Sequence, residues 1–302
     1  MSVHSKALLF LAAVLALAIS SLAQEDNDPV RVDSSIVVLN ATIRDAQDRP
    51  VGGLAEKDFK IFEDGIQHPI TWFAAEETPF AAVILIDTSG SMEQRISIAR
   101  SAAINFLNGL RPEDMAAIYR FDSKISLVQD FSESRDVADK IFDLKAQGQT
   151  VLNDAVLRAA KDLSNRTEKR KAIIVLSDGA DTFSSASADK ALKAALAANV
   201  TIYSVDMSTV DVAGQMRRQN QGVLRSFASK TGGVFISTEN GRDLRDALKA
   251  IVDELGVQYT LAFEPAGIKR DGKWHSIELR VARSNLKIRT REGYNAAKPS
   301  GK

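Results

Sequence analysis

The sequence predicts an α/β protein in which a doubly wound, mostly parallel sheet flanked by helices is inserted into a small β-sandwich. Three observations predict this class. Residues 81–86 are apolar throughout, which is typical of a strand buried on both faces of a parallel sheet. Strand and helix patterns then alternate as far as residue 255, as in repeated βαβ units. Both ends of the chain carry alternating β patterns, and neither end has enough strands for a stable sandwich of its own.

The first 23 residues have the three parts of a secretory signal peptide. Lys6 precedes an apolar run of 13 residues, Ala7–Ile19, and the stretch 20–23 has small residues at its third-last and last positions. That apolar run is too short for a membrane-spanning helix, which needs about 20 residues. We therefore expect cleavage after Ala23, a secreted or periplasmic protein, and no membrane anchor in the mature chain.

Residues 24–77 form an N-terminal β segment, and residues 257–302 form its C-terminal counterpart. Predicted strands cover 30–43, 58–62 and 70–73 in the first segment, and 258–263, 274–281 and 286–290 in the second. We expect the two segments to pair into one sandwich, so that residues 78–256 are an inserted domain. Trp72 and Trp274 are expected to pack inside this sandwich.

The inserted segment alternates between the two patterns. Predicted strands cover 81–86, 115–121, 125–131, 171–177, 200–205 and 233–237. Predicted helices cover 95–110, 137–144, 152–163, 188–198, 224–230 and 244–255. The polar stretch 210–222 predicts a loop.

The composition excludes several chemistries. The 39 Lys and Arg residues balance 39 Asp and Glu residues, so the chain lacks the positive charge typical of nucleic-acid-binding proteins. It has no Cys, which rules out disulfides, thiol catalysis and thiolate metal sites. The sequence also has no G-x-S-x-G elbow, no phosphate-binding loop and no His close to its serine motif. We therefore expect a protein that is not an enzyme and has no catalytic residues.

Oxygen-bearing side chains follow two of the apolar strands. Asp87, Ser89 and Ser91 come directly after the first strand of the inserted domain, and Asp178 follows the fourth. When these two strands are neighbours in a doubly wound sheet, their carboxyl ends meet at the crevice where such sheets bind ligands. The loop that carries Thr150 can reach the same crevice. These five residues predict a metal site made of oxygen ligands only.

Carboxylate and hydroxyl oxygens favour hard cations such as Mg²⁺, Mn²⁺ or Ca²⁺ over Zn²⁺ or Cu²⁺. Mg²⁺ takes six oxygens and keeps several waters, so some of these side chains would bind it directly and others through water. We expect Mg²⁺, with Mn²⁺ and Ca²⁺ as alternatives. A turn that merely caps the following helix is the simpler explanation of the serine motif taken alone.

The pattern Asp87-x-Ser89-x-Ser91, with Thr150 and Asp178 downstream, resembles the metal-ion-dependent adhesion site of von Willebrand factor A domains. The resemblance covers roughly residues 78–256. It implies a Rossmann-like fold. In the wider superfamily the two serines and the threonine often contact the ion, the aspartates often act through water, and a carboxylate of a partner completes the shell.

The two ends of the chain carry a second resemblance. Asp58-Phe-Lys-Ile-Phe-Glu-Asp-Gly and the closing Arg291-Glu-Gly-Tyr294 are similar to segments of secreted bacterial proteins, mainly acidobacterial, that contain a related domain. Together the resemblances imply an exported adhesion module that captures a protein partner through an Asp or Glu side chain, without nucleic acid or stable membrane insertion. The alternatives are a structural domain with a loop-stabilising ion and a metal-dependent hydrolase.

Other polar residues have simpler explanations. Asp181 and Asp122 follow strands and are expected to cap helices or shape turns. The alternatives are that Asp181 supports the metal ligands from behind and that Asp122 approaches the crevice. His68 and His275 are isolated, each within a β segment, and are expected to be packed or surface residues and not metal ligands.

Overall fold

The structure is a computed structural model. It describes residues 36–75, 78–133, 139–208, 214–238, 240–265 and 271–296. The chain divides into two units, Met1–Ser34 and Ser35–Lys302, and the described residues belong to the second. The predicted signal peptide, Met1–Ala23, lies outside the described residues. No helix within the described ranges is long and apolar enough to cross a membrane.

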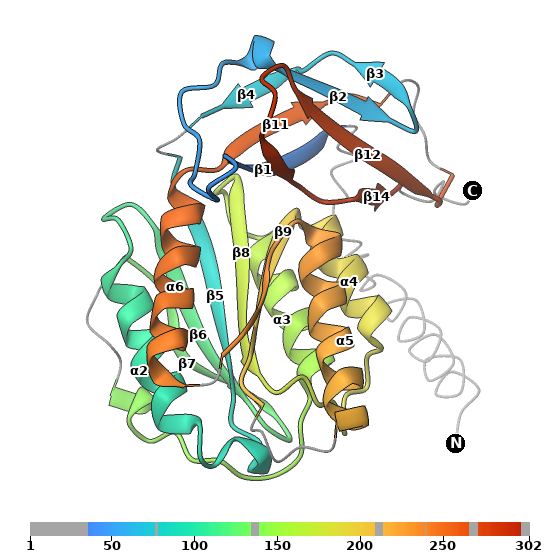
Figure 1. The fold of residues 1–302 in the computed structure, drawn as a ribbon. Coiled ribbons are helices and arrows are strands. Elements are labelled where there is room, and N and C mark those ends of the chain that lie inside the picture. Colours follow the sequence, from blue (N-terminus) through green and yellow to red (C-terminus); the bar gives the residue numbers. More distant parts are fainter. Residues whose placement is uncertain are drawn as a thin grey trace, which may run out of the picture. The chain divides into compact units, whose positions relative to one another are not determined.

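A six-stranded sheet has the order β10-β9-β8-β5-β6-β7 (Figure 1). Its strands are β5 (Phe80–Asp87), β6 (Met115–Phe121), β7 (Ile125–Ser132), β8 (Arg170–Ser177), β9 (Val200–Asp206) and β10 (Phe235–Ser237). All neighbours are parallel except β6 and β7. The strand order reverses between the adjacent strands β5 and β8, so the predicted doubly wound sheet and its switch point are confirmed.

Helices cover both faces of this sheet (Figure 1). One face carries α2 (Ile96–Asn108) and α6 (Gly241–Gly256), and the other carries α3 (Leu152–Ser164), α4 (Ala188–Ala197) and α5 (Gly214–Thr231). Side chains of β5 alternate between the two cores, because successive residues of a strand point to opposite faces. Every residue of β5 is buried, as its uniformly apolar sequence predicts.

Two predicted helices differ from the observed structure. Helix α5 begins at Gly214, so the described part of the predicted loop 210–222 is helical. Its buried residues all lie at or after Leu224, which leaves the first half without an apolar period. The predicted helix 137–144 is wrong in its described part, where only a 3-10 turn, Asp139–Ile141, forms around one buried side chain.

The two ends of the chain build a pair of four-stranded sheets, here called the β-domain, ordered β13-β1-β11-β4 and β14-β12-β2-β3. Their strands are β1 (Val37–Arg44), β2 (Phe59–Glu63), β3 (Ile66–His68), β4 (Trp72–Ala74), β11 (Tyr259–Phe263), β12 (Trp274–Val281), β13 (Lys287–Arg289) and β14 (Gly293–Asn295). Strand β1 pairs with β11 and β13, and β2 pairs with β12. The predicted pairing of the two ends is therefore confirmed.

Details of the β-domain differ from the predictions. The predictions omit β3 and β14, which have three residues each and are too short to show a clear alternation. The expectation that both tryptophans pack inside is wrong, since Trp72 and Trp274 are 41% and 43% exposed. Trp72 opens the edge strand β4, and Trp274 occupies an outward position of the alternating strand β12.

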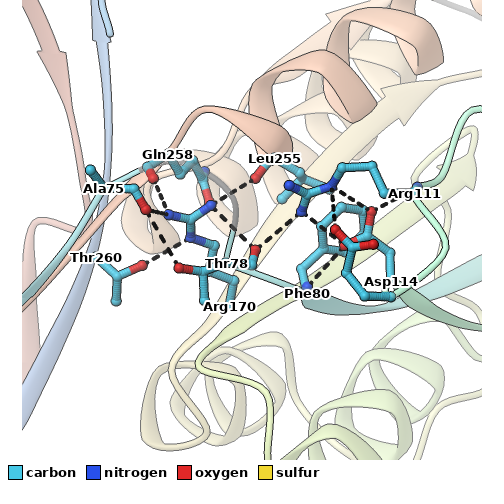
Figure 2. A network of polar contacts seen from close by, with 10 residues as sticks. Ala75, Thr78, Phe80, Arg111, Asp114, Arg170, Leu255, Gln258 and Thr260 are labelled. Carbon is cyan, nitrogen blue, oxygen red and sulfur yellow. Dashed lines mark hydrogen bonds and ion pairs between the residues drawn. The ribbon is translucent and has the colours of Figure 1, made fainter. Parts of the chain in front are cut away.

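A buried arginine joins the β-domain to the six-stranded sheet (Figure 2). Arg170 is the first residue of β8 and is fully buried. Its guanidinium donates to Thr260 Oγ1 and to the carbonyl oxygens of Ala75, Thr78, Leu255 and Gln258. The amino end of the sheet is therefore fixed to β11 and to the last turn of α6.

Glu254 makes a second connection near the end of α6. Its carboxylate binds Arg289 of β13, accepts from Arg44 of β1 at 2.9 Å and accepts from the Tyr203 hydroxyl at 2.7 Å. Burial acts to raise the pKa of Glu254, but the Arg289 guanidinium and these hydrogen bonds lower it below its usual value. The carboxylate thus remains ionised between two arginines of the β-domain.

Candidate metal centre

The predicted metal ligands lie at the carboxyl ends of β5 and β8 and in the loop before α3. Asp87 is the last residue of β5, and Asp178 directly follows the last residue of β8. Arg170, at the other end of β8, contacts the β-domain. The candidate site and the β-domain therefore lie at opposite ends of the sheet (Figure 1).

Asp87 is a fully buried carboxyl group that accepts hydrogen bonds from two donors in neighbouring loops. Its Oδ2 accepts from Ser177 Oγ at 2.6 Å, and its Oδ1 accepts from the backbone N–H of Ser89 at 2.9 Å. Burial raises the pKa of Asp87 to about 7, and the charge of Asp178 raises it too, against the lowering effect of the Ser177 and Ser89 hydrogen bonds. Within the described residues, neither Asp87 nor Asp178 forms an ion pair with a basic side chain.

Ser89 and Ser91 belong to the turn that links β5 to α2. Ser89 caps a 3-10 helix, Gly90–Met92, and its Oγ lies 3.2 Å from Ser91 Oγ. Ser89 is buried, Ser91 is exposed, and the fully buried Met92 fixes the turn to the core. The two hydroxyls are therefore adjacent neutral oxygens, of which one faces solvent.

Backbone hydrogen bonds hold Thr150 between two loops. Gly90 N donates to Gly148 O at 3.2 Å, which joins the serine turn to the loop of Thr150. Thr150 N donates to Thr182 Oγ1 at 3.0 Å, and Thr150 O accepts from the backbone N–H groups of Thr182 and Phe183, both at 3.0 Å. The buried Thr150 is thereby placed between the serine turn and the loop that follows Asp178.

Two glycines permit this close approach of loops. Gly148 has φ +76°, and a Cβ there would lie 2.6 Å from Ser123 Oγ. Gly179 has φ +81°, and a Cβ there would lie 2.6 Å from the carbonyl oxygen of Asn220. A larger residue at either position would strain the backbone, and at Gly179 it would also push the loop away from helix α5.

Side-chain and backbone contacts bring the five predicted metal ligands to the same edge of the sheet. Asp87, Ser89 and Ser91 are linked by side-chain contacts, and Asp178 is close enough to Asp87 to affect its pKa. Thr150 joins through the backbone of its loop. Two carboxyl groups and three hydroxyls at one edge, with burial opposing the ionisation of Asp87, fit a hard divalent cation.

Comparison with known proteins identifies the domain that carries these residues. Residues 82–180, which include all five side chains, match the family model of the von Willebrand factor type A domain. The chain contains a von Willebrand factor type A domain. A protein of Synechocystis sp. is 27% identical to the chain over 167 residues, which are 54% of this chain and 38% of that protein. The match therefore spans well under two thirds of that relative.

Solved structures similar to this chain include a von Willebrand factor type A protein from Catenulispora acidiphila, with 14% identity and a TM-score of 0.49. The alignment covers 80% of this chain and 76% of that protein. The von Willebrand domain of the type V pili tip protein Mfa5 from Porphyromonas gingivalis has 14% identity and a TM-score of 0.49, over 60% of this chain and 95% of that one.

Two further aspartates of the A domain organise loops, as predicted. Asp181 Oδ2 accepts from the backbone N–H of Asn153 at 2.8 Å and so caps the start of α3. Asp122 accepts from Lys124 N at 3.1 Å within its own turn and from Thr88 Oγ1 at 3.3 Å. Asp122 therefore supports the loop of the candidate site through Thr88.

The sequence analysis missed a third aspartate at this edge. Asp206 is the buried last residue of β9, next to β8, and its Oδ1 accepts from Ser208 N at 2.9 Å. This contact repeats the one between Ser89 N and Asp87. Its Oδ2 accepts from Gln221 Nε2 at 2.6 Å, which ties β9 to α5. The recurrence of Asp-x-Ser after an apolar strand is the sequence signal that would have identified it.

Proposed function

We propose that this protein is a binding module that captures a protein partner through a divalent ion held by Asp87, Ser89, Ser91, Thr150 and Asp178. One observation carries the proposal. Asp87 is fully buried with its pKa raised to about 7, beside a second carboxyl group, and has no basic ion-pair partner among the described residues. A cation bound between these carboxylates would remove the cost of ionising Asp87.

In the proposed site, hydroxyl and carboxylate side chains have different roles. We assign direct contact to the hydroxyls of Ser89, Ser91 and Thr150, and direct or water-mediated contact to Asp87 and Asp178. Mg²⁺ is the proposed ion because all donors are oxygens, and Mn²⁺ or Ca²⁺ would use the same set. When bound, the ion supplies a coordination position that an outside oxygen can occupy.

A carboxylate is the partner group that this site suits best. Hydroxyls are neutral, so the direct ligands leave much of the cation's charge for an incoming anion. An Asp or Glu side chain on a partner can supply that charge, and the attraction to a partly dehydrated ion exceeds that of an exposed ion pair. The exposed Ser91 marks the side from which the partner approaches. With the predicted signal peptide, this assigns the protein to adhesion outside the cytoplasm.

We further propose that the site binds its partner without catalysis. The two histidines among the described residues, His68 and His275, both belong to the β-domain at the opposite end of the sheet. An imidazole is therefore not at hand near Ser89 as a general base. A purely structural ion that ties the loops together is the second candidate, because the loops already join at Thr150.

The test compares metal binding with partner binding. Mg²⁺ is titrated by calorimetry into the wild type, into Thr150→Ala and into Ser97→Ala, an exposed serine of α2 that serves as the control. We expect Thr150→Ala alone to weaken binding. Partner capture from exported proteins should require Mg²⁺ and disappear with EDTA. A partner retained in EDTA would reject adhesion at this site. An ion that raises the melting temperature without any ion-dependent partner would favour the structural role.

A further inference from the structure

The β-domain carries a second group of metal-ligating side chains, far from the candidate site of the A domain. Glu63 ends β2, Asp64 lies in the turn to β3, and His275 lies in β12. One ligand atom from each of the three lies within 4.8 Å of the other two. Glu63 is fully buried and His275 is nearly so, while the side chain of Asp64 is 40% exposed. The group is therefore enclosed on the protein side and open through Asp64.

His275 stands between carboxylates at both of its ring nitrogens. Its Nδ1 lies 2.7 Å from Asp64 Oδ2 and 3.8 Å from Glu63 Oε1, and its Nε2 lies 3.2 Å from Asp271 Oδ1. A neutral imidazole donates through one nitrogen only. When Nε2 carries the hydrogen toward Asp271, Nδ1 directs a lone pair at two carboxylates, an arrangement that a shared cation stabilises.

The second histidine contacts the same glutamate. His68 of β3 is buried, and its Nε2 lies 3.1 Å from Glu63 Oε2. Apart from His4, these are all the histidines of the sequence, and both are packed, as the sequence predicts. More than 200 residues separate His68 from His275 along the chain, and the pairing of β2 with β12 and β3 brings both to Glu63.

We propose that Glu63, Asp64 and His275 form a transition-metal site of the zinc class, with Glu63 Oε1, Asp64 Oδ2 and His275 Nδ1 as ligands. Mixed imidazole and carboxylate ligands suit Zn²⁺, unlike the all-oxygen set of the A domain. Ligands bound to a tetrahedral zinc ion at ~2.0–2.1 Å lie roughly 3.3 Å apart. The observed separations from His275 Nδ1, 2.7 Å and 3.8 Å, bracket that value.

The surroundings of the three ligands match those of zinc sites. Histidine ligands commonly donate their other ring N–H to a carboxylate, and ligating carboxylates are themselves hydrogen-bonded. Asp271 occupies the first of these positions, and the Tyr294 hydroxyl, which donates to Glu63 Oε1 at 2.6 Å, occupies the second. The three protein ligands leave a fourth position, on the side of the exposed Asp64, for water or a further ligand.

The test uses Zn²⁺ alone as the probe, on the full chain with Asp87→Ala, so that the A-domain site does not contribute. Calorimetry should give about one equivalent of bound Zn²⁺, and the melting temperature should rise with Zn²⁺ concentration. Adding His275→Gln should weaken Zn²⁺ binding at least tenfold. Asp48→Asn, an exposed acidic residue of the β-domain, is the matched control and should leave the affinity unchanged.

A spectroscopic measurement and a second variant distinguish the loss of a metal ligand from a failure to fold. Co²⁺ in place of Zn²⁺ should give visible absorption bands that shift or vanish in His275→Gln. If His275→Gln does not fold, Asp64→Asn serves instead, because that side chain is partly exposed. The proposal is overturned if the Asp87→Ala chain binds no Zn²⁺. It is also overturned if both ligand variants bind Zn²⁺ like the control.

Discussion

At the amino end of the six-stranded sheet, Arg170 opens β8 as a fully buried cation, whereas at the carboxyl end Asp87 closes β5 as a fully buried acid. The chain surrounds Arg170 with carbonyl oxygens, among them that of Leu255 in the last turn of α6, where the helix dipole is negative. It surrounds Asp87 with hydroxyl and amide donors but, within the described residues, with no cation.

The two ends therefore differ in role: the amino end is a joint, meaning that Arg170 connects the sheet to the β-domain, whereas the carboxyl end is the proposed binding site. Arg170 of the six-stranded sheet donates hydrogen bonds to Thr260 of the β-domain and to Ala75, so acceptors of the protein itself satisfy its charge (Figure 2). At the carboxyl end burial raises the pKa of Asp87 and Asp178 adds to the effect, so a bound cation would stabilise the ionised form of the proposed site. The fold thus satisfies the buried charge of Arg170 internally, whereas the proposed function leaves the charge of Asp87 to be balanced by a bound ion.

Arg170→Met gives the largest effect that the comparison predicts. The substitution removes the guanidinium hydrogen bonds to four carbonyl oxygens and to Thr260 Oγ1, and it leaves those acceptors without that partner. We expect the free energy of unfolding to fall by about 3–5 kcal/mol. Urea denaturation followed by circular dichroism measures this value.

An exposed arginine provides the control. Arg280 is 57% exposed at its side chain and pairs with Glu278 at 2.7 Å, so Arg280→Met should lower the free energy of unfolding far less than Arg170→Met does. If Arg170→Met is no more harmful than Arg280→Met, the amino end is not a joint, and the contrast with the carboxyl end fails.

Asp87→Asn should separate binding from stability. It removes a charge that would balance the cation, so Mg²⁺ affinity should fall at least about 30-fold, or about 2 kcal/mol. The metal-free variant should unfold at the same or a higher temperature at pH 8, because an amide has no ionisation cost in this buried position. Calorimetry and thermal melts measure both effects.

The control for this variant is a nearby aspartate with a structural role. Both carboxylate oxygens of Asp181 accept backbone hydrogen bonds, and an amide keeps only one such oxygen. Asp181→Asn should therefore lower the melting temperature while it leaves Mg²⁺ affinity within about twofold. Strong Mg²⁺ binding by Asp87→Asn would remove Asp87 from the proposed site.

The raised pKa of Asp87 predicts a pH dependence of the metal-free protein. The pKa is about 7 in the folded chain against a usual value of 3.8, so at intermediate pH the folded state keeps a proton that the unfolded state releases. Stability from this group is complete below the unfolded pKa and is lost as the pH rises through about 7. Between pH 5 and pH 8 we expect the wild type to lose about 1–3 kcal/mol relative to Asp87→Asn.

Saturating Mg²⁺ should offset this loss at pH 8, because the ion stabilises the ionised carboxylate. The measurement is a set of urea titrations at several pH values, with EDTA or with Mg²⁺, on both proteins. Parallel pH curves for the wild type and Asp87→Asn would contradict the assignment of the raised pKa to this residue.

The two ends of the six-stranded sheet differ in how well the sequence predicts them, because their residues are separated by different distances along the chain. Asp87, Ser89 and Ser91 follow one apolar strand closely, and the switch-point rule adds Asp178, so local pattern and topology together predict the site. Arg170 precedes an apolar strand without any local signal, and its acceptors come from three other segments of the chain. Its role appears only after the two chain ends have paired.

The β-domain shows the same limit. Alternation predicts the longer strands and their pairing, but β3 and β14 are too short to carry a period. His68 lies in one of these short strands, so its approach to Glu63 depends on an element that the pattern cannot reveal. Long-range side-chain clusters of this kind follow from register, which a single sequence specifies only weakly.

Ser91→Ala should have the smallest effect, and it sharpens the assignment of the open side of the A-domain site. Ser91 is exposed, and its hydroxyl contacts Ser89 Oγ at 3.2 Å, so its loss removes one neutral ligand without disturbing the core. We expect Mg²⁺ affinity to fall about 3–10-fold, or roughly 0.6–1.4 kcal/mol, with a change in unfolding free energy within about 0.5 kcal/mol. The exposed Ser97 supplies the matched control, since Ser97→Ala should change neither quantity. Mg²⁺ affinity that is equal in the two variants would show that the ion is held without Ser91, and the partner would then have to approach from another side of the loops.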